Sequence, residues 1–351
     1  MLKIAAALLL VCASLAMWVG CRSNSSLYVY AAIPGANQIV AYREDPNAGV
    51  LTALAGSPLA AGPTVQSIVI HPSKKFLYAA NSGESDVSLF TLSSSGGLAE
   101  VTPRTIVGPA PTLLAMDPAG SYLYVGNSGS TSVSVFSINA TTGALTAVGA
   151  PTSTGIAPLN MKVSPSGNVL YVTGAGVPEG YIEVFSLNAG VLTPLQVVQP
   201  GANPYGLAIN PAGTYLYTAN AGDNSISEFT INPDGTLTSL ASAIGETYST
   251  PVALLINKAG TYLYVANEGS SNLAGYSIGT DGGLSLLSDS PYGTGAQPDY
   301  IATDSTGNYV FVGNQSSPVL QSFSLDVNSG TLTSVGSYKV SGTATSIAAT
   351  P

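Results

Sequence analysis

The fold of this chain is decided by a stretch at residues 207–240, which reads LAINPAGTYLYTANAGDNSISEFTINPDGTLTSL. Four short apolar or alternating segments can be read in it, at residues 207–210, 215–220, 225–231 and 236–240. Such segments are typical of β-strands, and the Pro and Gly residues between them are typical of turns. The stretch therefore predicts four consecutive strands that pair as an antiparallel meander.

The same four-strand pattern recurs seven times along the chain, at intervals of 46 to 50 residues. One marker of each copy is an aromatic residue in the second strand: Tyr28, Tyr78, Tyr124, Tyr171, Tyr217, Tyr264 and Phe311. The other is a glycine in the hairpin before the outer strand: Gly49, Gly97, Gly143, Gly190, Gly235, Gly283 and Gly330. Repeats of this length form the four-stranded blades of propellers. The sequence predicts an all-β fold, a single seven-bladed β-propeller.

The two ends of the chain explain how the ring closes. An inner-strand segment precedes six of the seven second strands, and the first copy, which starts at Leu27, lacks one. The missing segment is found at the C-terminus, at residues 346–351. We expect it to pair beside residues 27–32, with Ile347 next to Tyr28, because closure removes exposed strand edges. A two-domain β-sandwich is the competing architecture, but it requires neither equal spacing nor a permuted last strand.

Composition restricts the partners of the chain. Only 8% of the residues are charged, the formal net charge is −9, and the nine Lys and Arg residues form no cluster. Nucleic acid is therefore an unexpected partner. His71 is the one histidine of the sequence, which rules out a His-based metal site, and no carboxylate cluster has a spacing suited to calcium. We expect no metal and no cofactor.

The N-terminus has the pattern of an export leader. Residues 1–20 contain Lys3 and a long apolar run, and Cys21 opens a polar tether at residues 21–26, before the propeller at residues 27–351. Gly20 before Cys21 resembles a bacterial lipobox, so we predict lipidation at Cys21, a membrane tether and an extracytoplasmic location in the bacterial cell envelope. Cleavage after Ala16 and an uncleaved anchor are the alternatives, because Trp18 departs from the lipobox pattern.

A ligand site is predicted at the mouth of the central channel. The loops that join successive blades share this face with the loops between the second and third strands, and ligands prefer such concave places. The inner strands begin there with mostly neutral side chains, which suit hydrogen bonding or stacking. The predicted ligand-binding residues are Gln66, Thr112, Asn160, Tyr205, Asp299 and Tyr300.

The run Gly-x-Tyr-Leu-Tyr-Val-x-Asn, at residues 120–127 and 260–267, resembles the YVTN-type repeats of the seven-bladed propeller lactonase family. That family includes 6-phosphogluconolactonase and carboxymuconate-cyclizing enzymes, and the resemblance covers residues 27–351. It implies an Asn-Glu pair after a second strand, which Asn267 and Glu268 match, and makes Glu268 the catalytic candidate. The family's Pro-Arg-His motif is replaced here by residues 251–253, Pro-Val-Ala.

Three functions are therefore open for the predicted propeller. The leading hypothesis is a monomeric module that binds a small-molecule or protein ligand at the channel mouth, because the family's His and Arg positions are substituted. The alternative is a lactone hydrolase or cycloisomerase that uses Glu268 with Asp299 or Tyr300. The third is a structural surface protein. His71 is expected to cap a turn, since it occupies the slot of Asp117 and Asn210 in other blades.

Overall fold

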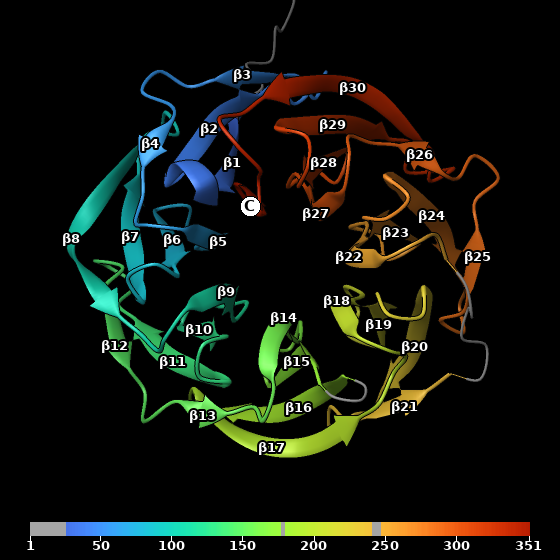
Figure 1. Cartoon of the computed structure of the whole chain (residues 1–351), viewed down its shortest axis with the longest axis horizontal. Helices are drawn as coiled ribbons and strands as arrows, with labels where there is room; N and C mark the ends of the chain where they lie inside the picture. Colours follow the sequence, from blue (N-terminus) through green and yellow to red (C-terminus); the bar gives the residue numbers. More distant parts are fainter. Residues whose placement is uncertain (1–25, 177–179, 241–246) are drawn as a thin grey trace, which may run out of the picture.

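A computed structural model describes residues 26–176, 180–240 and 247–351 of the chain. Seven antiparallel sheets stand around a central channel, each with one edge strand innermost, which confirms the seven-bladed propeller (Figure 1). The leader and Cys21 lie outside the described residues. Among the residues that are described, no helix is long and apolar enough to cross a membrane.

Each blade is a meander whose strands run in order from the channel to the rim. Blade 1 consists of β31 (Ser346–Ala349), β1 (Leu27–Ile33), β2 (Gln38–Glu44), β3 (Leu51–Ala53) and β4 (Leu59–Ala60), with a short 3-10 helix η1 (Pro34–Ala36). Blade 2 consists of β5 (Val65–Ile70), β6 (Phe76–Asn81), β7 (Asp86–Leu92) and β8 (Leu98–Ile106). Blade 3 consists of β9 (Pro111–Met116), β10 (Tyr122–Asn127), β11 (Ser132–Ile138), β12 (Leu145–Ala147) and β13 (Thr152–Ser153).

The remaining four blades repeat this arrangement. Blade 4 consists of β14 (Ala157–Val163), β15 (Val169–Ala175), β16 (Tyr181–Asn188) and β17 (Val191–Val198). Blade 5 consists of β18 (Pro204–Ile209), β19 (Tyr215–Asn220), β20 (Ser225–Ile231) and β21 (Leu237–Ser239). Blade 6 consists of β22 (Pro251–Ile256), β23 (Tyr262–Asn267), β24 (Asn272–Ile278), β25 (Leu284–Leu286) and β26 (Tyr292–Gly293). Blade 7 consists of β27 (Pro298–Thr303), β28 (Tyr309–Asn314), β29 (Val319–Leu325) and β30 (Leu332–Lys339).

The second-strand aromatics fasten neighbouring blades together. Tyr217 is fully buried, and its hydroxyl donates to the carbonyl oxygen of Gly282 in the next blade at 2.7 Å. Tyr78 and Tyr264 make the same bond to Gly143 and Gly330. A buried hydroxyl needs such a partner, so these tyrosines are packing residues of the blade joints.

Three sequence markers, one tyrosine and two glycines, were displaced. In blade 1 the residue that makes the joint bond is Tyr30, which donates to Gly96, and not the predicted Tyr28. Gly96 and Gly282, and not Gly97 and Gly283, adopt positive φ angles, of 79° and 87°. At Gly96 a Cβ atom would lie 2.3 Å from the Tyr28 ring, so only glycine fits there.

The C-terminal strand closes the ring, as expected. β31 pairs antiparallel with β1, and the C-terminus lies beside the first blade at the channel (Figure 1). The register differs from the predicted one by three residues: Ile347 lies opposite Ala31, whereas Tyr28 exchanges hydrogen bonds with Thr350 at 2.9 and 3.0 Å. Ile347 is 3% exposed and belongs to the core between blades 1 and 7. The blade-1 marker was misaligned because Tyr28 and Tyr30 lie two residues apart on the same strand, and Tyr30 is the one that corresponds to Tyr217.

Candidate functional site

A β-bulge at the start of the inner strands aims side chains at the channel mouth. In blade 7, Pro298 pairs with Asn314 and Tyr300 with Gly313, so Asp299 between them has no partner on β28. The same two-residue shift leaves one extra residue in five of the other inner strands, β5, β9, β14, β18 and β22: Gln66, Thr112, Leu159, Tyr205 and Val252. Bulges re-aim side chains in this way next to functional sites.

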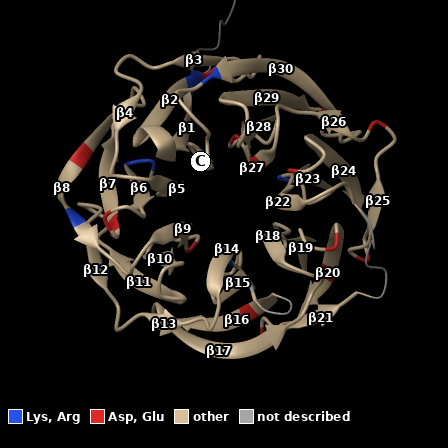
Figure 2. Cartoon of the chain, viewed as in Figure 1, with Lys and Arg blue, Asp and Glu red and all other residues tan. Residues whose placement is uncertain are grey.

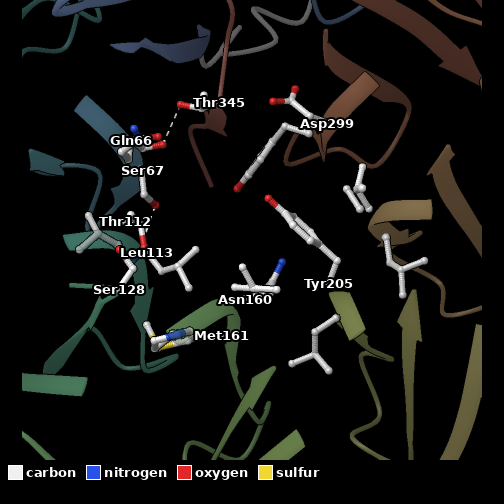
Figure 3. Close-up of a pocket in the computed structure, with 18 of the residues that line it drawn as sticks. Gln66, Ser67, Thr112, Leu113, Ser128, Asn160, Met161, Tyr205, Asp299 and Thr345 are labelled. Carbon is white, nitrogen blue, oxygen red and sulfur yellow. Dashed lines mark hydrogen bonds between the residues drawn. The ribbon is translucent and has the colours of Figure 1, made fainter. Parts of the chain in front are cut away.

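The bulges lie beside a cavity of about 460 Å³ at the mouth of the channel. All the residues predicted to bind a ligand line it, and Glu268 lines it too: Gln66, Thr112, Asn160, Tyr205, Glu268, Asp299 and Tyr300. In Figure 3, Tyr205 and Asn160 extend toward the middle of this cavity, with Gln66 and Asp299 on its wall. The structure thus brings together, at one cavity, residues from six blades that the sequence analysis had assigned to the channel mouth.

Asp299 is the most unusual group of the cavity. Its Oδ1 atom is buried and has no hydrogen-bond partner in the described part of the chain. Burial raises the pKa of this carboxyl to about 7, and the negative charge of Glu268 adds to the increase. A carboxyl with this pKa can exchange a proton near neutral pH, a property that is concentrated at functional sites.

Glu268 and Tyr205 interact electrostatically with Asp299 and with each other. The Glu268 backbone N–H donates to the Thr250 carbonyl at 2.8 Å, and its Oε1 accepts a bond from Gln297 at 3.4 Å. Burial raises the pKa of the Tyr205 hydroxyl, and the charges of Asp299 and then Glu268 raise it further. The Tyr205 side chain is nevertheless 39% exposed, so its ring offers an accessible aromatic surface.

Sequence reasoning missed Lys162, which also lines the cavity. It lies two residues after Asn160 on β14, and side chains two apart on a strand share a face. That alternation is the signal that could have identified it. The ion pairs among the described residues all involve Arg104, so Lys162 is available to a ligand.

His71 serves a structural role, as the sequence indicated. Its Nδ1 accepts a bond from the Ser73 backbone N–H at 3.0 Å, and its Nε2 bonds the Gly120 carbonyl of blade 3 at 2.9 Å. Asn210 caps the same turn in blade 5 through the Tyr215 N–H. No group of three His, Cys, Asp or Glu suited to a metal occurs within the described ranges.

Comparison with known proteins establishes the family. Residues 60–157, 152–253 and 241–349 match the family described as Lactonase, 7-bladed beta-propeller. Since these segments span most of the chain, the protein belongs to the seven-bladed β-propeller lactonase family. No curated protein matches its sequence significantly.

Solved structures with the same fold come from several bacteria. A candidate 6-phosphogluconolactonase from Bacteroides fragilis is 21% identical with a TM-score of 0.81, and the alignment covers 94% of this chain and 99% of that one. The periplasmic gluconolactonase of Pseudomonas aeruginosa is 20% identical with a TM-score of 0.76, with coverage of 93% and 99%. At these identities the similarity shows the fold alone.

Proposed function

We propose that the channel-mouth cavity binds a small, neutral molecule with several hydroxyl groups, such as a sugar or a sugar lactone. The supporting observation is the convergence of an exposed aromatic ring, Tyr205, with an unpartnered carboxyl oxygen of Asp299 in one cavity. An aromatic face covers the apolar side of a sugar ring, and carboxylates and amides accept or donate bonds to its hydroxyls.

The charges of the cavity favour an uncharged ligand. Lys162 is its one cation among the described lining residues, against the carboxylates Glu268 and Asp299. A phosphate dianion is usually held by several cations or by clustered backbone N–H groups. We therefore expect the unphosphorylated form of a sugar lactone to bind better than the phosphorylated form.

Lactone hydrolysis is the second candidate function, and the pKa of Asp299 favours it. A carboxyl with a pKa of about 7 is partly ionised at neutral pH and can take a proton from an attacking water molecule. Lys162 or the Asn160 amide could then stabilise the negative charge that develops on the lactone carbonyl oxygen. This assignment moves the catalytic candidate from Glu268 to Asp299, with Glu268 as the group that helps raise its pKa.

Two measurements on the purified propeller separate these functions. Saturation-transfer NMR with γ-gluconolactone reports binding, and a pH-stat assay with δ-gluconolactone reports hydrolysis above the spontaneous rate. We expect binding that Asp299→Asn and Tyr205→Ala each weaken. Turnover lost in Asp299→Asn would establish the hydrolase, whereas binding without turnover would establish the binding module. Absence of both with neutral lactones and sugars contradicts the proposal.

We also propose that the propeller is exported and tethered by a lipid on Cys21, on the basis of the leader pattern at residues 1–21. The mass of the membrane-extracted protein should exceed that of the chain from Cys21 by a diacylglycerol group and an acyl chain. Cys21→Ala should release the protein from the membrane fraction. An unmodified Cys21 in the membrane-bound protein would contradict the tether.

A further inference from the structure

A second cavity lies at the rim of the propeller, away from the channel. It has a volume of about 320 Å³ and lies where β13 of blade 3 approaches β16 and β17 of blade 4. In Figure 2, β13, β16 and β17 lie at the outer part of the ring, away from the central channel. The lining residues are Ser153, Glu183, Val184, Phe185, Pro194, Leu195, Gln196 and Val197.

Most of the wall is apolar and partly open to solvent. Leu195 is 39% exposed and Val197 is 63% exposed, although both lie beside the buried ring of Phe185. Gln196 does not offer its amide to this cavity, because it exchanges two hydrogen bonds with the Leu237 backbone of blade 5, at 3.1 and 2.7 Å. The cavity therefore combines an apolar surface with few polar groups.

Glu183 is the charged group of this wall. Its Oε2 atom is buried and lacks a hydrogen-bond partner in the described ranges. Burial raises the pKa of the carboxyl to about 7. The titratable group facing it is Tyr181, the pKa of which is raised by burial and by the Glu183 charge. The Oε2 atom has therefore lost hydration that no hydrogen bond within the described residues replaces.

We propose that this rim cavity binds a small organic amine, with the ammonium group on Glu183 and an apolar body against Phe185, Leu195 and Val197. A protonated amine supplies both a charge and N–H donors to the Glu183 carboxylate, and an apolar body covers the exposed wall. An anion would be repelled by Glu183, and a plain hydrocarbon would leave the carboxyl without a partner. The proposal is independent of the function of the channel mouth.

The first test compares two ligands that differ in one group. Chemical-shift titration of the full propeller with phenethylamine and with phenethyl alcohol should give at least a roughly tenfold tighter Kd for the amine. The amine affinity should rise from about pH 6 to about pH 8, as Glu183 ionises. Glu183→Gln should remove both the preference and its pH dependence. Asp299→Asn, a control at the channel, should leave them unchanged.

A second variant tests the geometry without removing the carboxylate. Glu183 and Val197 are directly opposite each other on β16 and β17, so Val197→Lys would place an ammonium group beside Glu183. We expect this variant to abolish amine binding and to raise the melting temperature, and Glu183→Gln in the Val197→Lys background to reverse that increase.

Three results would overturn the proposal. They are equal affinities for the amine and the alcohol, amine binding that Asp299→Asn abolishes, and unchanged amine binding in Val197→Lys. The first would indicate a purely apolar site, the second binding at the channel mouth, and the third binding elsewhere on the propeller.

Discussion

Two buried carboxyls with the same electrostatic character occupy very different places in this propeller. Asp299 lines the channel mouth, and burial raises its pKa to about 7. Glu44 lies at the end of β2 near the closing joint between blades 1 and 7; it is 2% exposed, and burial, followed by the charges of Asp304 and Asp45, raises its pKa to about 8. Both Glu44 oxygens lack a hydrogen-bond partner within the described residues.

The two carboxyls differ in their accessibility to a ligand. Glu44 is almost fully buried and lines neither of the two cavities described above, so we expect its burial to cost stability without serving a ligand. Asp299 lines an open cavity together with the exposed aromatic ring of Tyr205 and with Lys162. A raised pKa therefore indicates a functional site only together with a surface that a ligand can contact.

The largest effect on stability is expected where β31 closes the ring beside β1. Deleting residues 341–351 removes β31 and the buried Ile347, and leaves β1 with an open edge. We expect the melting temperature of the whole domain to fall by roughly 10 °C or more, in one cooperative transition. Ile347→Ala should reproduce part of this destabilisation, because the cavity that it leaves should lower the free energy of unfolding by about 2–4 kcal/mol. Unchanged melting of the truncated chain would contradict ring closure.

Glu44 should make the propeller less stable at alkaline pH. Its folded pKa of about 8 lies above the unfolded value of 4.5, so the folded chain holds a proton that the unfolded chain has released. Stability should be highest below the unfolded value, fall as the pH rises toward 8 and stay low above it. At pH 9, Glu44→Gln should raise the free energy of unfolding by on the order of 2–4 kcal/mol.

A matched control is the exposed Glu84, which forms a surface ion pair with Arg104; Glu84→Gln should change stability by about 0.5 kcal/mol or less. The measurement is urea unfolding at several pH values. If Glu44→Gln leaves the slope of stability against pH unchanged, the assignment of a buried, protonated Glu44 is wrong.

The third prediction sharpens the comparison at the channel mouth. Asp299→Asn should raise the free energy of unfolding at pH 8 by about 1 kcal/mol, because it removes a partly buried charge without a partner. A gain in stability accompanied by loss of ligand binding is typical of a functional residue. Thermal unfolding with and without γ-gluconolactone measures both effects. A variant that is destabilised would indicate that Asp299 holds the fold together.

The smallest effect is expected at a regular blade joint. Tyr217→Phe removes the hydroxyl that bonds the Gly282 carbonyl and keeps the ring, so it should cost about 1 kcal/mol. Blade 7 has Phe311 at the equivalent position, which shows that the ring alone can fill this site. Chemical denaturation measures the difference, and a cost above about 3 kcal/mol would mean that these hydroxyls contribute more than one ordinary bond.

More of the fold than of the candidate site could be predicted from the sequence. The equal spacing of the markers was enough to predict seven blades, and the permuted last strand was enough to predict ring closure. Both features can be read directly from the repeat. The pairing register of β1 with the C-terminal strand could not be predicted in this way. Tyr28 and Tyr30 lie two residues apart on the same face of β1, so the sequence does not show which of them is the marker. At the mouth, the positions were found from their place in the repeat, whereas the raised pKa of Asp299 and the role of Lys162 depend on burial and strand alternation in three dimensions.

The most direct test measures γ-gluconolactone binding by calorimetry in the wild-type protein, Asp299→Asn and Glu44→Gln under one set of conditions. The account predicts that Glu44→Gln binds as the wild type does, while Asp299→Asn weakens binding by at least about tenfold. Equal binding in all three proteins, or equal loss in both variants, would contradict the claim that access to a cavity distinguishes the two carboxyls.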